Sequence, residues 1–125
     1  MPLRVFCLLI VIASIGCTKG PQRADPVDPD KARNTLRVVL DAWKKGEKAS
    51  ALQQRQPPIV VQDMDWETGF QLMDYQVLGP DRAEDANLFC PVKLVLRGPD
   101  GEISTKEVTY IVGTSPRLTV FRSLY

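Results

Sequence analysis

The sequence predicts a single α+β domain in which an N-terminal helix packs on an antiparallel sheet of about four strands. Apolar residues recur at helical spacing between Ala32 and Trp43, which indicates an amphipathic helix. Apolar and polar residues then alternate along residues 90–97, which is typical of a strand with one buried face. The turn sequence Gly98-Pro99-Asp100-Gly101 leads into a second alternating run, so the two runs are expected to form a hairpin.

The first helix is expected over residues 29–45. Asp28 is a favourable N-cap and Pro29 suits the first helical position, while Lys44-Lys45-Gly46 is typical of a helix end. Capping also accounts for the cluster of Asp25, Asp28 and Asp30 better than a metal site does. Trp43 belongs to the apolar stripe and is therefore expected in the core. A second short helix is expected over residues 48–54.

The remaining strands follow from short apolar or alternating runs. In chain order the expected segments are a possible strand at 59–61, strands at 70–78 and 90–97, a return strand containing Val108, Tyr110 and Val112, and a last strand at 118–121. In 70–78 we expect Met73, Tyr75 and Val77 on one face and Phe70 and Leu72 on the other. Cys90 alternates with the inward set and reads as a buried apolar residue, and 83–87 reads as a polar connection.

Composition excludes several classes of function. The chain has 125 residues, with 16 Lys and Arg against 15 Asp and Glu, so it lacks the basic excess of a nucleic-acid-binding domain. It contains no histidine, which removes the commonest general base and the commonest metal ligand. Of three cysteines only Cys90 lies in the body of the chain, so no zinc spacing is present. No cofactor or metal is predicted.

The N-terminus reads as a secretory signal. Arg4 precedes the apolar run 5–13, which is shorter than the roughly 20 residues that a membrane-spanning helix needs. The next residues, Ser14-Ile15-Gly16-Cys17, resemble the lipobox of bacterial lipoproteins, although Ser14 stands where Leu is commonest. The resemblance implies cleavage before Cys17, lipidation of Cys17 and attachment to a membrane in the cell envelope after secretion across the inner membrane. The alternative is an ordinary signal peptide with a chance cysteine.

This reading divides the chain into a signal peptide at 1–16, a tether at 17–27 that follows the lipidated cysteine, and one α+β domain at 28–125. Thr18 follows the cysteine rather than Asp, which by analogy with enterobacterial sorting favours the outer membrane. The tether is rich in proline and polar residues and has no apolar periodicity.

Acidic residues alternate in Asp63-Met64-Asp65-Trp66-Glu67. The spacing is similar to the start of a calcium loop, but the glycine and the terminal glutamate of an EF-hand loop are missing. We therefore expect an exposed acidic turn here.

The helix ending at Trp43-Lys44-Lys45-Gly46-Glu47 and the hairpin from Lys93 to Val112 together resemble cystatin-like or NTF2-like domains. The resemblance implies a helix lying across the concave face of a curved antiparallel sheet, an arrangement that can leave a pocket. The chain thus resembles a small bacterial lipoprotein with such a domain. Fold alone does not assign a function.

Three functions are compatible with the sequence. The favoured one is a membrane-tethered, non-catalytic binding or accessory domain, held by lipid at Cys17, whose protein or small-molecule partner is unknown. The second is a pocket enzyme such as an isomerase or dehydratase, and its acid and base groups would come from Asp63, Asp65, Asp74, Tyr75 or Tyr110. The third is a structural envelope protein that acts through the sheet edge or the exposed face, with the C-terminal strand, 118–125, pairing with a partner chain or with a second copy of itself.

Overall fold

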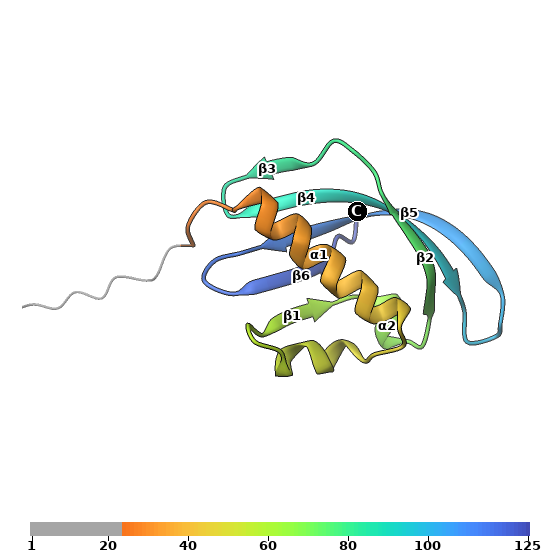
Figure 1. Ribbon diagram of the computed structural model, residues 1–125. Helices are drawn as coiled ribbons and strands as arrows, with labels where there is room; N and C mark the ends of the chain where they lie inside the picture. The colour runs from red at the N-terminus through yellow and green to blue at the C-terminus, as the bar shows by residue number, and fades with distance from the viewer. Residues whose placement is uncertain (1–23) are drawn as a thin grey trace, which may run out of the picture.

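The computed structural model describes residues 24–125, and Cys17 and the predicted signal peptide lie outside them. The elements in chain order are α1 (Pro29–Lys44), a 3-10 helix η1 (Ala49–Gln54), β1 (Ile59–Gln62), α2 (Met64–Glu67), β2 (Gln71–Val77), β3 (Arg82–Glu84), β4 (Asn87–Arg97), β5 (Ile103–Gly113) and β6 (Leu118–Arg122). The strands form one curled sheet, and α1 lies across one of its faces (Figure 1). The predicted α+β class is confirmed.

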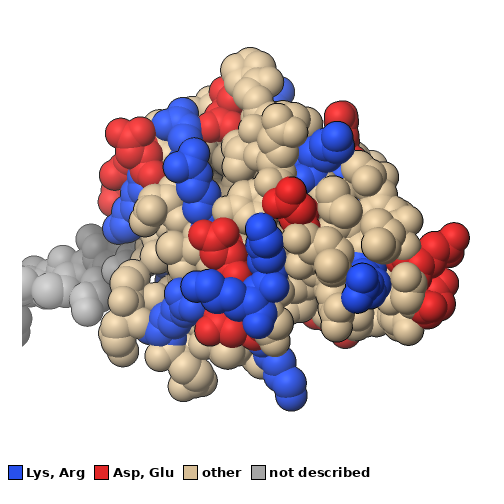
Figure 2. Space-filling view, turned by 45° about the vertical axis from the view of Figure 1, so that its right-hand side comes forward, with Lys and Arg blue, Asp and Glu red and all other residues tan. Residues whose placement is uncertain are grey.

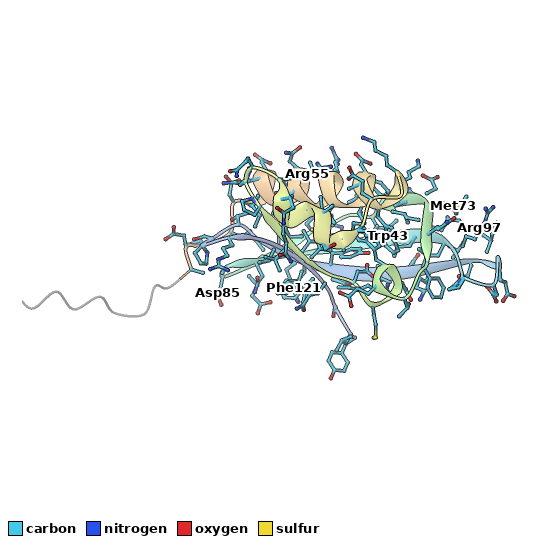
Figure 3. All side chains as sticks on the ribbon, turned by 90° about the horizontal axis from the view of Figure 1, so that it is seen from below. Trp43, Arg55, Met73, Asp85, Arg97 and Phe121 are labelled. Atoms are coloured by element: carbon cyan, nitrogen blue, oxygen red, sulfur yellow. The ribbon has the colours of Figure 1, made fainter. Side chains whose placement is uncertain are left out.

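The helix α1 forms where its periodicity and caps predict it. The side chain of Asp28 accepts a hydrogen bond from the backbone N–H of Lys31 at 3.2 Å, and Pro29 occupies the first turn. The buried stripe includes Trp43, which is 3% exposed and lies between the helix and the sheet (Figure 3). The second predicted helix is present as the 3-10 helix η1.

The sheet is larger than the predicted one and is mixed rather than antiparallel. Its strand order is β1-β6-β5-β4-β2, and β3 pairs with β4 beside β2. The strand β1 runs parallel to β6, with Ile59 opposite Leu118, whereas all other pairs are antiparallel. A four-residue run such as β1 carries too little pattern to reveal its partner. Since β6 lies between β1 and β5, both of its edges are paired within the chain, which leaves none for the partner strand considered above.

The core lies between α1 and the concave face of the sheet. Alternate residues of β4 point into it, as predicted, and Cys90 is fully buried among them. The hairpin between β4 and β5 turns through the predicted glycines, and Gly101 adopts a φ of +86°, which a residue with a side chain rarely takes.

The strand β2 contains an irregularity that the alternation did not predict. Leu72 pairs with Leu96, but the next paired residue is Asp74, opposite Val95, so Met73 is an extra residue on this strand. The extra residue shifts the alternation by one position. Leu72 and Tyr75 therefore share the face toward α1, while Met73 is 37% exposed, so the predicted grouping of Met73 with Tyr75 is wrong.

The segment predicted as a polar connection, 83–87, also contains most of the short strand β3. Beside it the chain enters the domain. Val27 is 9% exposed and donates its backbone N–H to the carbonyl of Asp85 at 2.9 Å, and the backbone N–H of Asp28 donates to Thr114 Oγ1 at 3.1 Å. The last residues of the predicted tether thus contact the end of the sheet at which β3 turns into β4 and β5 turns into β6.

Candidate functional site

The segment predicted to be an exposed acidic turn is instead the short helix α2, and the prediction of exposure is wrong for Asp63. Its carboxylate caps the helix by accepting from the backbone N–H groups of Asp65 at 3.0 Å and Trp66 at 3.3 Å. Asp63 is only 2% exposed, and Trp66, three residues further on in α2, packs into the core. Sequence spacing showed the carboxylates but not the partners that allow one of them to be buried.

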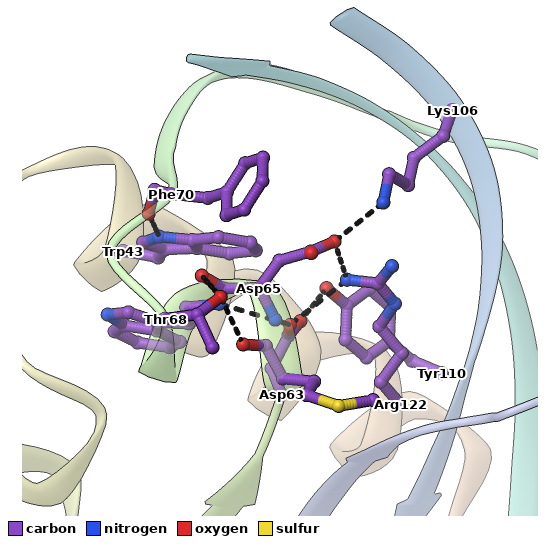
Figure 4. Close-up of polar contacts among 10 residues, drawn as sticks. Trp43, Asp63, Asp65, Thr68, Phe70, Lys106, Tyr110 and Arg122 are labelled. Carbon is purple, nitrogen blue, oxygen red and sulfur yellow. Dashed lines mark hydrogen bonds and ion pairs between the residues drawn. The ribbon is translucent and has the colours of Figure 1, made fainter. Parts of the chain in front are cut away.

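Those partners come from β5 and β6. The hydroxyl of Tyr110 donates to Asp63 Oδ2 at 2.5 Å, and Arg122 donates to Asp63 Oδ1 at 3.0 Å (Figure 4). Arg122 also bonds to Asp65, which accepts a further hydrogen bond from Lys106 Nζ at 2.8 Å. We call these five residues the polar cluster; they are Asp63, Asp65, Lys106, Tyr110 and Arg122.

The contacts of the polar cluster shift the pKa values of Tyr110, Asp65 and Arg122. Burial raises the pKa of Tyr110 far above its usual value, and the neighbouring charge of Asp63 raises it further, so the phenol stays protonated. Burial alone would raise the pKa of Asp65, but hydrogen bonds from Lys106 and Arg122 outweigh it and lower that pKa. Burial would likewise lower the pKa of Arg122, and the two carboxylates reverse the effect and raise it.

The hydrogen bonds and charges of the polar cluster are satisfied largely within the cluster. The Asp63 carboxylate already accepts four hydrogen bonds, two from backbone N–H groups and one each from Tyr110 and Arg122. The negative charges of the two carboxylates in the polar cluster are balanced by the positive charges of Lys106 and Arg122. A recess of about 700 Å³ opens beside the cluster and is also bordered by Met64 and Leu124. A general base must be accessible to its substrate, and the Asp63 side chain is 1% exposed and already bonded to Tyr110 and Arg122.

The other two sequence candidates lie elsewhere, on β2, where each bonds to a side chain of α1. The hydroxyl of Tyr75 donates to Asp41 Oδ1 at 2.7 Å, and burial together with that carboxylate raises the pKa of Tyr75 to about 12. Asp74 is exposed and accepts from Lys44 Nζ at 3.4 Å. The structure therefore brings Asp63, Asp65 and Tyr110 together and leaves Asp74 and Tyr75 apart.

Sequence reasoning missed Lys106 and Arg122. Each had a weak signal, since each is a cation at an inward position of a strand: Lys106 pairs with the buried Leu94, and Arg122 pairs with Tyr110. A charge on an inward face requires a partner of opposite sign.

A larger hollow lies on the other side of α2. It has a volume of about 910 Å³ and lies at the C-terminal end of α1. Its apolar wall includes Trp43 and Trp66, whose rings stack with centroids 5.2 Å apart and planes 8° apart, and the half-buried Phe70. We call it the aromatic hollow; its lining is Trp43–Ser50, Gln53, Val61, Trp66, Glu67 and Gly69–Met73.

Both indole N–H groups are used to build the aromatic hollow. Trp43 Nε1 donates to the carbonyl of Phe70 at 2.9 Å, and Trp66 Nε1 donates to the carbonyl of Glu47 at 3.0 Å. These bonds join α1, the loop before η1, α2 and the start of β2. The wall is therefore held in place by the fold, as in a preformed ligand site.

Charges are mixed on the surface. On the face shown in Figure 2, Lys and Arg side chains are interspersed with Asp and Glu, and no large area has one sign. Within residues 24–125, no three His, Cys, Asp or Glu side chains gather as metal ligands would. None of the helices in this described part is long and apolar enough to cross a membrane.

Comparison with protein-family models, with curated proteins and with solved structures gives no significant match. Neither these comparisons nor the geometry of the described residues gives any positive indication of catalysis.

Proposed function

We propose that this protein is a non-catalytic ligand-binding domain anchored to a membrane of the bacterial envelope through lipid on Cys17. The observation that carries the proposal is the aromatic hollow. Its volume of about 910 Å³ lies within the range of small-molecule sites, and its lining combines aromatic and aliphatic side chains with charged and polar ones. The polar cluster, in contrast, is occupied by its own internal bonds.

The position of the aromatic hollow fits a tethered domain. The chain enters the domain at the N-terminal end of α1, and the aromatic hollow lies at the C-terminal end of this 16-residue helix. At 1.5 Å per residue the two ends are about 24 Å apart. A ligand site at the far end from the tether stays accessible when the other end is held near a membrane.

For the fold, we propose the cystatin-like or NTF2-like architecture. The features that support it are the capped helix across the concave face and the long hairpin of β4 and β5. In such an arrangement the space between the helix end and the curled sheet serves as the pocket, which is where the aromatic hollow lies.

The alternatives have less support. A pocket enzyme would need an available acid or base, and the carboxylates beside Tyr110 are bonded internally. A structural role in which the last strand pairs with another chain needs an unpaired strand edge, and β6 is paired on both sides. Nucleic acid is not proposed as a partner, because the formal net charge is +1 and the charges are mixed.

Ligand binding can be tested by filling the aromatic hollow. Ser50 is an exposed residue of its lining, and Ser50→Trp places a large ring there. As the control, Thr105→Trp introduces the same ring at an exposed position of β5. Protein recovered from envelope fractions is examined by native mass spectrometry. We expect a small-molecule adduct on the wild type and on Thr105→Trp but not on Ser50→Trp. If both variants keep the adduct, the ligand binds elsewhere on the protein. If the wild type carries no adduct, the proposal is contradicted.

Anchoring is tested separately by fractionating cells that produce the wild type or Cys17→Ser, with the intact mass of the mature chain. We expect an acylated wild type in the membrane fraction and an unacylated, membrane-free variant. A wild type without acyl chains would remove the anchor and leave the ligand-binding proposal in place.

A further inference from the structure

The charges and rings of the aromatic hollow define which ligand it suits. Resting on the function proposed above, we propose that the aromatic hollow binds a small organic anion with a flat, apolar body. The body would lie against the aromatic wall, and the anionic group would lie at the rim near Lys45 and Lys48.

The flat body follows from the wall. The half-buried Phe70 is the most exposed aromatic side chain of the wall, whereas Trp43, Trp66, Leu72 and Val61 border the hollow with 9% exposure or less. In Figure 4 the ring of Phe70 lies beside that of Trp43. Aromatic faces bind flat apolar groups by offset stacking and exclusion of water.

The anionic group follows from the rim. Its charged residues are Lys44, Lys45, Lys48, Glu47 and Glu67. Lys44 is paired with Asp74 at 3.4 Å, and Glu47 with Arg55 at 2.9 Å. Among the described residues, Lys45, Lys48 and Glu67 make no ion pair, which leaves two exposed cations against one carboxylate.

The end of α1 does not oppose an anion strongly. A helix C-terminus carries partial negative charge on its unpaired carbonyl groups. Here the carbonyls of Asp41, Ala42 and Trp43 accept hydrogen bonds from the backbone N–H groups of Lys45, Glu47 and Gly46 respectively. The partial charge is thereby reduced, and the two lysine side chains set the sign of the rim.

The tryptophan side chains report on this site specifically, because the chain has two tryptophans, Trp43 and Trp66, and both line the aromatic hollow. The protein is used in the form in which cells process it, and its indole N–H resonances are followed by NMR. The probes are naphthalene-2-sulfonate, an anion, and naphthalene-2-sulfonamide, its neutral analogue. The test variant is Lys45→Gln/Lys48→Gln, and the control is Lys93→Gln/Arg97→Gln, which removes two exposed cations from β4.

We expect the sulfonate to bind about fivefold more tightly than the sulfonamide at low salt, the factor for one exposed charge contact in water. The preference should disappear in Lys45→Gln/Lys48→Gln, persist in the control, and weaken with salt. Equal or tighter binding of the sulfonamide would overturn the anion preference while leaving the aromatic hollow as a binding site. If neither probe moves the indole resonances, the inference fails, and the Ser50→Trp experiment still decides the proposed function independently.

Discussion

At the scale of single residues, Asp63 has the most consequences for the structure. Asp63 directly follows β1, and its carboxylate caps α2 and bonds to side chains on β5 and β6. An ionised carboxylate is buried at little cost only when its hydrogen-bonding capacity is filled. Two backbone N–H groups of α2, Tyr110 and Arg122 together donate four hydrogen bonds to it, so the polar cluster acts as a clamp between α2 and the sheet.

Removing the phenol oxygen tests this clamp. We expect Tyr110→Phe to lower the free energy of unfolding by about 1–3 kcal/mol, because a buried carboxylate oxygen loses a partner. Tyr75→Phe is the matched control, since its hydroxyl bonds to Asp41 at an exposed position and its loss should cost about 1 kcal/mol or less. Urea denaturation measures both. Equal losses would show that burial of the Asp63 bond adds nothing.

Asp65 gives the polar cluster a dependence on pH. Its pKa is lowered in the folded protein, so its ionised form stabilises the fold above the usual value of 3.8, and this contribution is lost as the pH falls through the folded value. We expect Asp65→Asn to be less stable than the wild type at pH 7 and the difference to shrink below about pH 4. Urea denaturation at several pH values measures it. A difference that stays constant down to about pH 2 would show that Asp65 is not the titrating group.

At the scale of elements, α1 is fixed by one indole. Trp43 fills the space between the helix and β2, stacks on Trp66 and donates to the carbonyl of Phe70. Through these contacts the end of α1, the helix α2 and the start of β2 form one unit, which is also the wall of the aromatic hollow.

We therefore expect Trp43→Ala to lower the free energy of unfolding by about 3–5 kcal/mol, because it leaves a cavity and an unpaired carbonyl. Met73→Ala, at the exposed extra residue of β2, should change it by less than about 1 kcal/mol. Thermal or urea denaturation compares the two. Near-wild-type stability of Trp43→Ala would contradict the packing described for this residue.

At the scale of the whole molecule, the parallel pair of β1 and β6 forms one edge of the sheet. The strand β1 follows η1 early in the domain, yet its strand partner is the last strand of the chain. No part of the sheet on that side can form until β6 is present. The fold therefore depends on contacts between distant parts of the sequence.

Two truncations test this dependence. Removal of Leu124 and Tyr125, which are 76% and 108% exposed, should change the free energy of unfolding by less than about 0.5 kcal/mol. Removal of residues 118–125 also deletes β6 and Arg122, and we expect it to abolish cooperative unfolding. Circular dichroism in urea measures both chains. Cooperative unfolding of the shorter chain would show that β1 and β6 are dispensable.

Local signals predicted the elements that depend on neighbouring residues. The cap at Asp28, the stripe ending at Trp43 and the turn at Gly101 are confirmed because each is determined within a few residues. The pairing of β1, the extra residue Met73 and the burial of Asp63 were not predicted, because each depends on a strand or side chain far along the chain.

The sequence by itself determined the α+β class, the first helix and the inward set of β4 that includes Cys90, since periodicity follows directly from helix and strand geometry. It also identified Asp63, Asp65 and Tyr110 as chemically notable. The tertiary structure alone decided what they do, because only folding brings Lys106 and Arg122 to them and encloses the aromatic hollow between α1, α2 and β2. Side chains distant in sequence acquire partners through the sheet register, and no local pattern carries that information.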